Sequence, residues 1–356
     1  MVTKARVKKL IDCLEAERKL EQEEWVELFR YWQNNRSQEL LDCAASKAKK
    51  VKEETFGNKI YIRGLIEFTS YCKNDCYYCG LRKSNQEAER YRLDDETIQE
   101  CCRRGYELGF RTFVLQGGED GYFTADRLSR IIMQIKAEFP QCAVTLSEGE
   151  RDFQTYKQWF EAGADRYLLR HETADARHYR RLHPSELSLE NRKQCLRNLK
   201  EIGYQTGCGV MVGSPGQTPE SLAQDMAFMK ELQPEMVGIG PFIPQHATPF
   251  AEEKPGTLEG TLFLLALVRL MLPKVLLPAT TALGTIHPEG REMGILSGAN
   301  VVMPNLSPAD VRKKYLLYDN KISTGAEAAE ALSSLKERMK AIGCEIAVGR
   351  GDSPCR

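Results

Sequence analysis

The sequence has 356 residues, a length that allows one large domain or two of ordinary size. Its 50 Lys and Arg residues balance 50 Asp and Glu residues, so no net charge attracts nucleic acid or an anionic membrane. A hydrophobic share of 42% and a charged share of 28% are typical of globular proteins and exclude a disordered or fibrous chain.

No targeting segment or membrane span is expected. The basic residues near the N-terminus, such as Lys4, are followed by acidic ones from Asp12 onward, without an uninterrupted apolar stretch. The longest apolar run, residues 262–279, is broken by Arg269 and Lys274, so it is unable to span a bilayer. We therefore expect a cytoplasmic protein. Disulfides are rare in that compartment, so clustered cysteines among the twelve indicate metal or redox chemistry.

Taken in chain order, the elements begin with helices and continue as a βα alternation. Residues 1–55 carry apolar residues at the spacing of one helix face. The strand candidates that follow are Tyr61–Thr69, Arg111–Gln116, Ala143–Ser147, Arg166–Arg170, Thr206–Met211, Met236–Phe242, Val275–Thr281 and Ala299–Pro304. The amphipathic stretches between them include Asp95–Gly105, Ala125–Phe139, Gln154–Ala162, Asn191–Ile202, Pro219–Leu232 and Leu258–Met271.

This alternation predicts an α/β fold with a parallel sheet, and eight repeats favour a closed (β/α)8 barrel of TIM type over an open doubly wound sheet. We expect an N-terminal helical extension over residues 1–55, the barrel over 56–322, and a C-terminal helix and tail over 323–356. Catalytic groups of such a barrel lie at the C-terminal ends of its strands.

Three cysteines follow the first predicted strand at the spacing C-x3-C-x2-C: Cys72, Cys76 and Cys79. Thiolates suit iron-sulfur clusters, and a four-iron cubane held by three protein ligands leaves one iron open. A structural zinc site needs four closed ligands, and no fourth cysteine or histidine is nearby. The loop therefore indicates a cluster with one iron free to bind another molecule.

The second predicted strand ends in Gln116-Gly117-Gly118-Glu119. Glycines allow the backbone to approach a ligand closely, and an acid beside them accepts hydrogen bonds from an ammonium group. The cysteine spacing, with Tyr78 before the last cysteine, resembles the signature of the radical S-adenosylmethionine (SAM) superfamily. The resemblance implies that the methionine part of SAM chelates the open iron, that the Gln116–Glu119 segment holds its amino group, and that the reduced cluster cleaves SAM to a 5′-deoxyadenosyl radical.

Further segments make the chain from about residue 61 to 321 resemble the HydE family of radical SAM maturases of FeFe-hydrogenase. These are residues 90–92, 167–174, 211–218, 236–244, 278–282, 298–305 and 315–318. The resemblance implies that Glu172 and Arg192 contact SAM and that Met211 packs near the adenosine. It also implies a substrate cavity inside the barrel, lined by Arg63, Thr145, Arg170, Thr280, Thr281, Met303, Tyr315 and Tyr318.

Arg63 lies in the middle of the first predicted strand, where an unpaired inward charge is costly. It therefore points outward against a helix or faces an anionic guest, and Arg170 poses the same choice. Inward arginines suit an anionic, cysteine-derived organometallic iron precursor, because guanidinium pairs well with such acceptors. The resemblance further implies an anaerobic enzyme with three kinds of partner: a GTPase scaffold of hydrogenase maturation, a tyrosine-cleaving radical SAM enzyme, and a reductant such as ferredoxin or flavodoxin.

Some family members carry a second cysteine group after the final strand, but residues 322–326 have no cysteine, and Cys344 and Cys355 stand too far apart to replace it. We expect a single 4Fe-4S cluster. Three alternatives remain: a methylornithine synthase, a biotin-synthase-like enzyme, and a noncatalytic iron-sulfur carrier or scaffold. Biotin synthase requires additional cysteine ligands inside the barrel, which the predicted strands do not supply. A dinucleotide-binding dehydrogenase is excluded because Gly207-Cys208-Gly209 lacks the third glycine.

Overall fold

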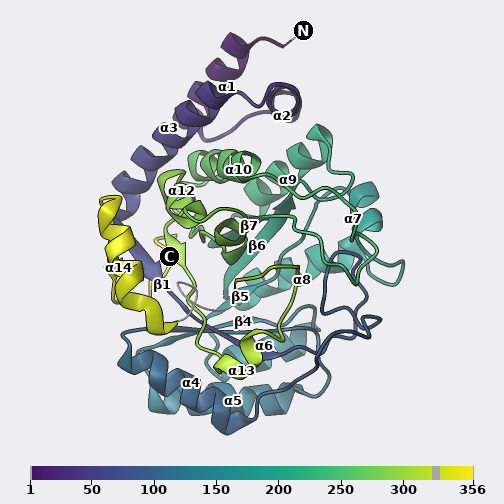
Figure 1. The fold of residues 1–356 in the computed structure, drawn as a ribbon, viewed down its shortest axis with the longest axis vertical. Helices are drawn as coiled ribbons and strands as arrows, with labels where there is room; N and C mark the ends of the chain where they lie inside the picture. Colours follow the sequence, from purple (N-terminus) through teal and green to yellow (C-terminus); the bar gives the residue numbers. More distant parts are fainter. Residues whose placement is uncertain (1, 323–328, 356) are drawn as a thin grey trace.

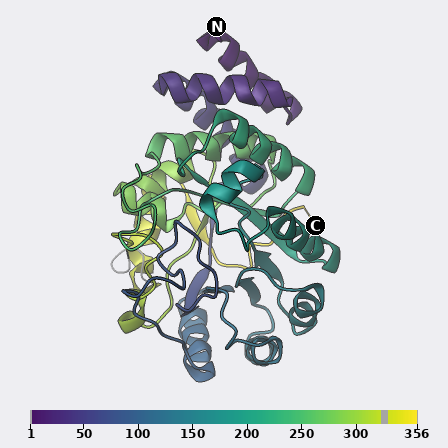
Figure 2. The same cartoon turned by 90° about the vertical axis from the view of Figure 1, so that its right-hand side faces the viewer.

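The computed structural model describes residues 2–322 and 329–355. The chain begins with three helices, α1 (Lys4–Glu17), α2 (Gln22–Asn35) and α3 (Gln38–Phe56). Their buried faces carry the apolar residues that recur at helical spacing. α2 packs on α9 (Pro219–Leu232), and α3 packs on α10 (Leu258–Met271). The three helices therefore cover one side of the barrel, at the top of Figures 1 and 2.

The strands of the described chain form two parallel sheets. Their bounds are β1 (Lys59–Ile62), β2 (Gly64–Thr69), β3 (Thr112–Gly117), β4 (Ala143–Ser147), β5 (Arg166–Leu168), β6 (Gln205–Val212), β7 (Met236–Pro241), β8 (Val301–Val302) and β9 (Glu345–Ala347). One sheet has the order β2-β3-β4-β5-β6-β7, and the other has the order β8-β1-β9. β1 and β2 together are the first predicted strand, and the change between sheets occurs at Arg63.

Single parallel bridges close these sheets into a ring. Leu65 bridges Asn305, Met236 bridges Leu276, and Pro278 bridges Val301. The predicted seventh strand is therefore a connecting segment without a regular ladder. Two features explain this: Pro278 has no backbone N–H to donate, and the N–H of Leu277 donates to the side-chain oxygen of Asn300. The closed (β/α)8 barrel that the sequence predicts is confirmed.

Helices surround the sheet on the outside (Figure 1). Besides α9 and α10 they are α4 (Asp95–Glu107), α5 (Ala125–Glu138), α6 (Phe153–Glu161), α7 (Ala176–Leu182), α8 (Leu189–Ile202), α11 (Thr281–Ile286), α12 (Gly290–Leu296) and α13 (Ala309–Arg312). α9 and α10 have the predicted bounds because each begins after a threonine, Thr218 or Thr257, whose side chain accepts a hydrogen bond from the first turn.

The C-terminal tail closes one end of the barrel. After a short 3-10 turn (Ala329–Ala331) and α14 (Leu332–Ala341), β9 pairs with β1. The chain then crosses the N-terminal ends of the strands, where Arg166 donates to the carbonyl of Arg350 and to Asp352. The expected boundary at residue 323 lies outside the described residues. The three-part division stays a prediction, and the pairing of β9 with β1 ties the tail to the barrel.

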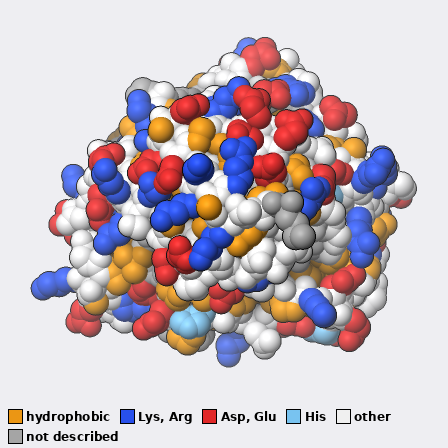
Figure 3. All heavy atoms as spheres, turned by 90° about the horizontal axis from the view of Figure 1, so that it is seen from above, with side chains coloured by type: hydrophobic (Ala, Val, Ile, Leu, Met, Phe, Trp, Pro, Cys, Tyr) orange, Lys and Arg blue, Asp and Glu red, His pale blue; other side chains and the backbone are white. Residues whose placement is uncertain are grey.

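The described helices include none long and apolar enough to cross a membrane. The face in Figure 3 carries Lys and Arg side chains beside Asp and Glu side chains, as the balanced composition predicts.

Candidate active site at the mouth of the barrel

The loop that follows β2 is held in place at the mouth of the barrel. The backbone N–H of Lys73 donates to the carbonyl of Glu119, and that of Gly80 donates to the carbonyl of Leu317. Within the loop, Asp75 accepts two hydrogen bonds from Arg82, at 2.8 and 2.6 Å. These hydrogen bonds lower the pKa of Asp75. The three cysteines therefore stand in a fixed loop.

The thiols of Cys72, Cys76 and Cys79 are half-buried. Burial raises the pKa of each; Cys79 and Cys72 raise that of Cys76 further, and Cys72 raises that of Cys79, to about 12. Thiolates here need a positive partner. Among the described residues, no group of three or more His, Cys, Asp or Glu side chains is placed to hold a single metal ion. The three thiols of this loop are donors of the soft kind that iron-sulfur clusters take.

Tyr78 joins the cysteine loop to the helical side of the site. Its hydroxyl lies 3.2 Å from Nε2 of His183, whose Nδ1 lies 3.1 Å from the carbonyl of Tyr179. Because a carbonyl only accepts, Nδ1 of His183 carries the proton and Nε2 accepts from Tyr78. Burial, and then Arg192, lower the pKa of His183 to about 3, so this histidine is neutral. Tyr78 is thereby fixed in one orientation.

Met211 belongs to a small apolar cluster apart from the main core. It packs with Leu182, Phe242 and Phe250, and Tyr78 lies against them. The structure therefore brings together two of the residues that the sequence assigns to SAM. The cluster offers an apolar surface beside the cysteine loop.

The glycines that end β3 bring the backbone against the cysteine loop. A Cβ on Gly118 would lie 2.3 Å from the carbonyl oxygen of Tyr71 and 2.6 Å from Cβ of Cys72. Only glycine allows this approach. Glu119, which follows, is buried; its Oε1 accepts from the N–H of Glu150 at 2.8 Å, and its Oε2 lies 3.2 Å from Lys73. The Gln116–Glu119 segment therefore lies beside Cys72, as the sequence predicts.

Glu172 occupies a strained position just after β5. Its φ of 62° lies in the left-handed region, which costs a residue with a side chain on the order of 1 kcal/mol. Its Oε2 lies 3.0 Å from Arg170 without hydrogen-bond geometry, so both side chains keep unpartnered polar atoms. Strain of this kind clusters at functional sites.

Arg192 of α8 reaches the same place from the outside. It donates to the carbonyl of Arg170 at 2.9 Å and to Oε1 of Glu150 at 2.5 Å. Burial alone would lower its pKa, but Glu150 raises it, so Arg192 stays charged. Sequence reasoning missed Glu150, because it stands far from Arg192 in the chain and follows a predicted strand without any motif.

The barrel interior holds buried polar atoms without hydrogen-bond partners in the described structure. They include Nε and Nη2 of Arg63, Nε and Nη2 of Arg170, and the hydroxyls of Thr145 and Thr280. Arg63 is 5% exposed, and its Nη1 lies 2.9 Å from Sδ of Met236. Burial, and then the charge of Arg166, lower the pKa of Arg63 well below its ordinary value. Each such atom carries a desolvation cost of about 1–3 kcal/mol unless a guest supplies the partner.

Glycines provide room beside these polar groups. Gly238 and Gly240 on β7 alternate with the buried Val237 and Ile239. A Cβ on Gly238 would meet nothing closer than 3.8 Å, where Cδ of Arg170 lies, and a Cβ on Gly240 would lie 3.0 Å from the hydroxyl of Thr280. Large side chains usually fill a barrel of this kind. Here, small residues face the arginine and threonine side chains.

The remaining predicted cavity residues lie at different depths. Met303 packs with Tyr61 and Met236 near the end that the tail closes. Thr281 begins α11, and Tyr318 is half-buried in the segment after α13. Tyr315 is buried, with the ammonium of Lys321 5.0 Å from its ring centroid.

Glu67 is an inward residue that sequence reasoning missed. It is fully buried, and Lys321 donates to it at 2.6 Å while Asn305 donates at 2.9 Å. The strand period of two places Glu67 on the same face of β2 as Leu65 and Thr69, while Ile66 and Phe68 of the other face join the main apolar core. That alternation is the signal that predicts its direction.

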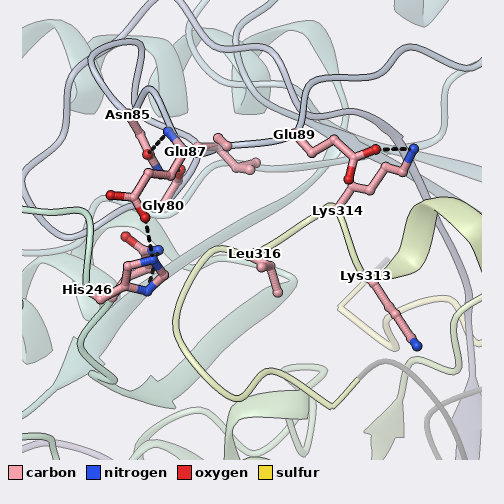
Figure 4. Close-up of a pocket in the computed structure, with 11 residues that line it drawn as sticks. Gly80, Asn85, Glu87, Glu89, His246, Lys313, Lys314 and Leu316 are labelled. Carbon is pink, nitrogen blue, oxygen red and sulfur yellow. Dashed lines mark hydrogen bonds and ion pairs between the residues drawn. The ribbon is translucent and has the colours of Figure 1, made fainter.

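A pocket of about 180 Å³ is lined by Gly80, the residue after Cys79, and by side chains such as Glu87 and His246 (Figure 4). At its rim Glu87 lies 3.0 Å from Nε2 of His246, and Glu89 lies 2.5 Å from Nζ of Lys314. Both exposed glutamates of this part of the loop are thus paired with cationic or imidazole groups. No predicted site residue lines this pocket.

Comparisons with known proteins agree with this site. The Radical SAM superfamily matches residues 66–229. The chain is 50% identical over 275 residues to the [FeFe] hydrogenase maturase subunit HydE of Thermotoga maritima, covering 77% of this chain and 78% of the relative. It is 32% identical over 314 residues to 3-methylornithine synthase of Methanosarcina acetivorans, covering 87% of each chain. The crystal structure of methylornithine synthase (PylB) matches with a TM-score of 0.83 and 28% identity, covering 95% of this chain and 97% of that one.

Proposed function

The chain belongs to the radical SAM superfamily and, within it, to the HydE family of [FeFe] hydrogenase maturases, and we propose that it acts on a cysteine-derived organometallic iron precursor held inside the barrel. It is a radical SAM enzyme of hydrogenase maturation that uses a 4Fe-4S cluster and SAM. The observation that carries the substrate proposal is the set of unpartnered polar atoms inside the barrel.

In this proposal Cys72, Cys76 and Cys79 hold one cluster and leave its fourth corner open. When bound, the cluster and SAM supply a 5′-deoxyadenosyl radical. Burial and neighbouring thiols raise the pKa of Cys76 and Cys79, so binding of a cationic iron site there is coupled to release of the thiol protons.

The residues proposed to hold SAM surround the cysteine loop. Glu119 and Glu172 accept hydrogen bonds from its polar groups, and Arg192 contacts SAM while it donates to the carbonyl of Arg170 and to Glu150. Gln116, Gly117 and Gly118 form the backbone cradle, while Tyr78 and Met211 provide the apolar side of the site. The hydroxyl of Tyr78 is held by a hydrogen bond to His183. Because His183 is neutral, it adds no charge to the apolar side of the site.

The substrate proposal follows from the charges inside the barrel. Arg63 and Arg170 keep guanidinium nitrogens without hydrogen-bond partners, although the carboxylate of Glu172 lies 3.0 Å from Arg170, and Thr145 and Thr280 add hydroxyls. An anionic guest with acceptor groups satisfies these donors and removes their desolvation cost. We assign the cavity to an anionic guest, with Thr281, Met303, Tyr315 and Tyr318 lining its other sides.

The physiological partners follow from the family. We propose that the product passes to a GTPase scaffold of hydrogenase maturation, that a tyrosine-cleaving radical SAM enzyme supplies the precursor, and that a ferredoxin or flavodoxin supplies electrons.

The test separates cleavage of SAM from turnover of the precursor. The variant Arg63→Met is expected to keep most of the 5′-deoxyadenosine formation of the reconstituted protein and to lose turnover of the organometallic precursor. Arg197→Met is the control, because Arg197 is an exposed arginine of α8 that pairs with Glu231. Equal loss of both activities in Arg63→Met contradicts the assignment of Arg63 to the substrate.

A second candidate, methylornithine synthase, rests on the 32% identical relative from Methanosarcina acetivorans. Incubation of the reconstituted enzyme with L-lysine and SAM decides between the two. We expect no methylornithine; its formation at the rate of precursor turnover contradicts the proposed substrate.

A further inference from the structure

Four side chains alternate along the surface beside the cysteine loop: Tyr71, Arg92, Tyr122 and Arg127, here called the Tyr-Arg stack. The guanidinium carbon of Arg92 lies 3.9 Å from the ring centroid of Tyr71 and 4.6 Å from that of Tyr122. The guanidinium carbon of Arg127 lies 4.2 Å from the ring centroid of Tyr122. Each distance is within the range of cation-π attraction, so the four side chains form one ordered surface.

The tyrosines of the stack are exposed. Tyr71 is 37% exposed and Tyr122 is 44% exposed, which places both among the few large hydrophobic side chains on the surface of the described chain. Tyrosine and arginine are enriched at the centres of protein interfaces, and pre-ordered side chains lose little entropy when a partner binds. The stack therefore has the composition and the order of an interface that awaits a partner.

The surface of the stack is cationic although its charges are paired. The side chain of Arg92 is 34% exposed, but that of its partner Asp120 is 3% exposed; Lys73 is 61% exposed, but its partner Glu119 is 6% exposed. Arg127 is 22% exposed and pairs with Asp95, which is 35% exposed, and Asp94 beside it is exposed as well. Lys73 and Arg92 are therefore the cations that face the solvent above buried carboxylates. This arrangement favours an acidic partner.

The stack continues directly into the cysteine loop. Tyr71 precedes Cys72 in the chain, and Asp120, which holds Arg92, also accepts a hydrogen bond from Thr69 at the end of β2. The proposed SAM and substrate sites face the barrel interior. A protein that delivers electrons to the cysteine loop has to approach from outside.

We propose that the Tyr-Arg stack, together with Lys73, is the docking surface for an acidic one-electron carrier protein, a ferredoxin. This inference rests on the proposed function. In each encounter the reduced ferredoxin loses one electron and the cluster gains it, and no atom or proton is transferred. The buried carboxylates hold the cations toward the carrier, and the tyrosines give it a rigid contact next to Cys72.

The test compares two double variants. Tyr122→Ser with Arg127→Gln removes the outer half of the stack and spares Tyr71 and Arg92, which touch the cysteine loop. Met133→Ser with Arg197→Gln is the matched control, since Met133 is 50% exposed on the same helix and Arg197 forms a single surface ion pair. We expect the Kd for ferredoxin, measured by biolayer interferometry, to rise about tenfold in the first variant, as for hot-spot residues, with a weaker salt dependence, and to stay unchanged in the control.

A functional readout separates docking from cleavage of SAM. With reduced ferredoxin as the sole reductant, 5′-deoxyadenosine formation at limiting ferredoxin is expected to fall about tenfold in the stack variant. With dithionite it is expected to match the wild type. Unchanged Kd in the stack variant overturns the docking surface. Absence of 5′-deoxyadenosine from the wild type with either reductant contradicts the proposed function, and the binding measurement still decides the docking surface.

Chemical cross-linking of the wild-type proteins tests the docking surface without any substitution. Carbodiimide joins a lysine amine to a carboxylate in contact with it, so the wild-type complex with ferredoxin is expected to yield a cross-linked peptide containing Lys73. Cross-links confined to distant lysines such as Lys157 overturn the proposal.

Discussion

Two arginines, Arg63 and Arg269, are both buried but differ in their hydrogen-bond partners. Arg63 is 5% exposed, and its Nε and Nη2 have no hydrogen-bond partner in the described structure. Arg269 is fully buried, but its guanidinium donates to the carbonyls of Gly298, Pro273 and Val275 and to the side chain of Asn300, at 2.7–3.1 Å. If Arg63 is reserved for a guest, the protein without substrate is less stable because of it.

The variant Arg63→Met keeps most of the length of the side chain and removes its charge. Replacing an unpaired buried charge with an apolar group is expected to raise the free energy of unfolding by about 1–4 kcal/mol, and the melting temperature Tm by a few degrees. Arg269→Met is expected to lower the free energy of unfolding by about 3–5 kcal/mol, since it leaves buried carbonyls without donors.

Thermal unfolding of the cluster-free proteins, followed by circular dichroism, measures the difference. We expect Tm to rise in Arg63→Met and to fall in Arg269→Met, relative to the wild type. A decrease in Tm for Arg63→Met as large as that for Arg269→Met would show that Arg63 stabilises the fold rather than awaiting a ligand.

The remaining predictions concern the cysteine loop and the tail. Gly118→Ala is expected to abolish retention of iron, because its Cβ would collide with Tyr71 and Cys72. In the control Gly121→Ala the new Cβ meets nothing within 4 Å, so the iron content is expected to stay unchanged. Equal iron content in both variants contradicts the close approach. His183 has a folded pKa of about 3 against about 6.5 when unfolded, so its stabilisation is complete above pH 6.5 and is lost as the pH falls, at up to about 1.4 kcal/mol per pH unit. Urea unfolding at pH 7 and pH 5 should show a smaller loss for His183→Gln, and an identical loss would exclude this histidine as the cause. Ending the chain after Val348 leaves the buried Arg166 without Asp352 and is expected to lower the free energy of unfolding by about 3–5 kcal/mol. Ending it after Pro354 is expected to leave Tm unchanged. Equal Tm values for the two truncated proteins would show that the tail does not hold the barrel closed.

The sequence predicts the elements whose signals are local. Periodicity and capping residues locate α9 and α10 because Thr218 and Thr257 mark their starts within the window that a periodicity test sees. Short helices such as α7 were missed, since seven residues give too little periodicity. The prediction of a regular seventh strand was wrong, because the side-chain oxygen of Asn300 accepts the backbone N–H of Leu277 that a ladder needs.

The site residues likewise divide into those that a local motif marks and those that only the fold brings together. The cysteine spacing and the glycines before Glu119 are local motifs, and the structure places them side by side. Glu150 was beyond prediction, because its role depends on a contact with Arg192 that only the folded barrel creates. The pairing of Arg166 with Asp352 is likewise a contact between distant parts of the chain, which no local pattern encodes.

We propose that three thiols at the mouth of the barrel hold one cubane with an iron open to SAM. Electron paramagnetic resonance of the anaerobically reconstituted, dithionite-reduced protein, before and after addition of SAM, is the decisive measurement. We expect a cubane signal of no more than about one spin per chain whose shape changes when SAM binds. A signal that SAM leaves unchanged, or one that integrates to about two spins per chain, would contradict it.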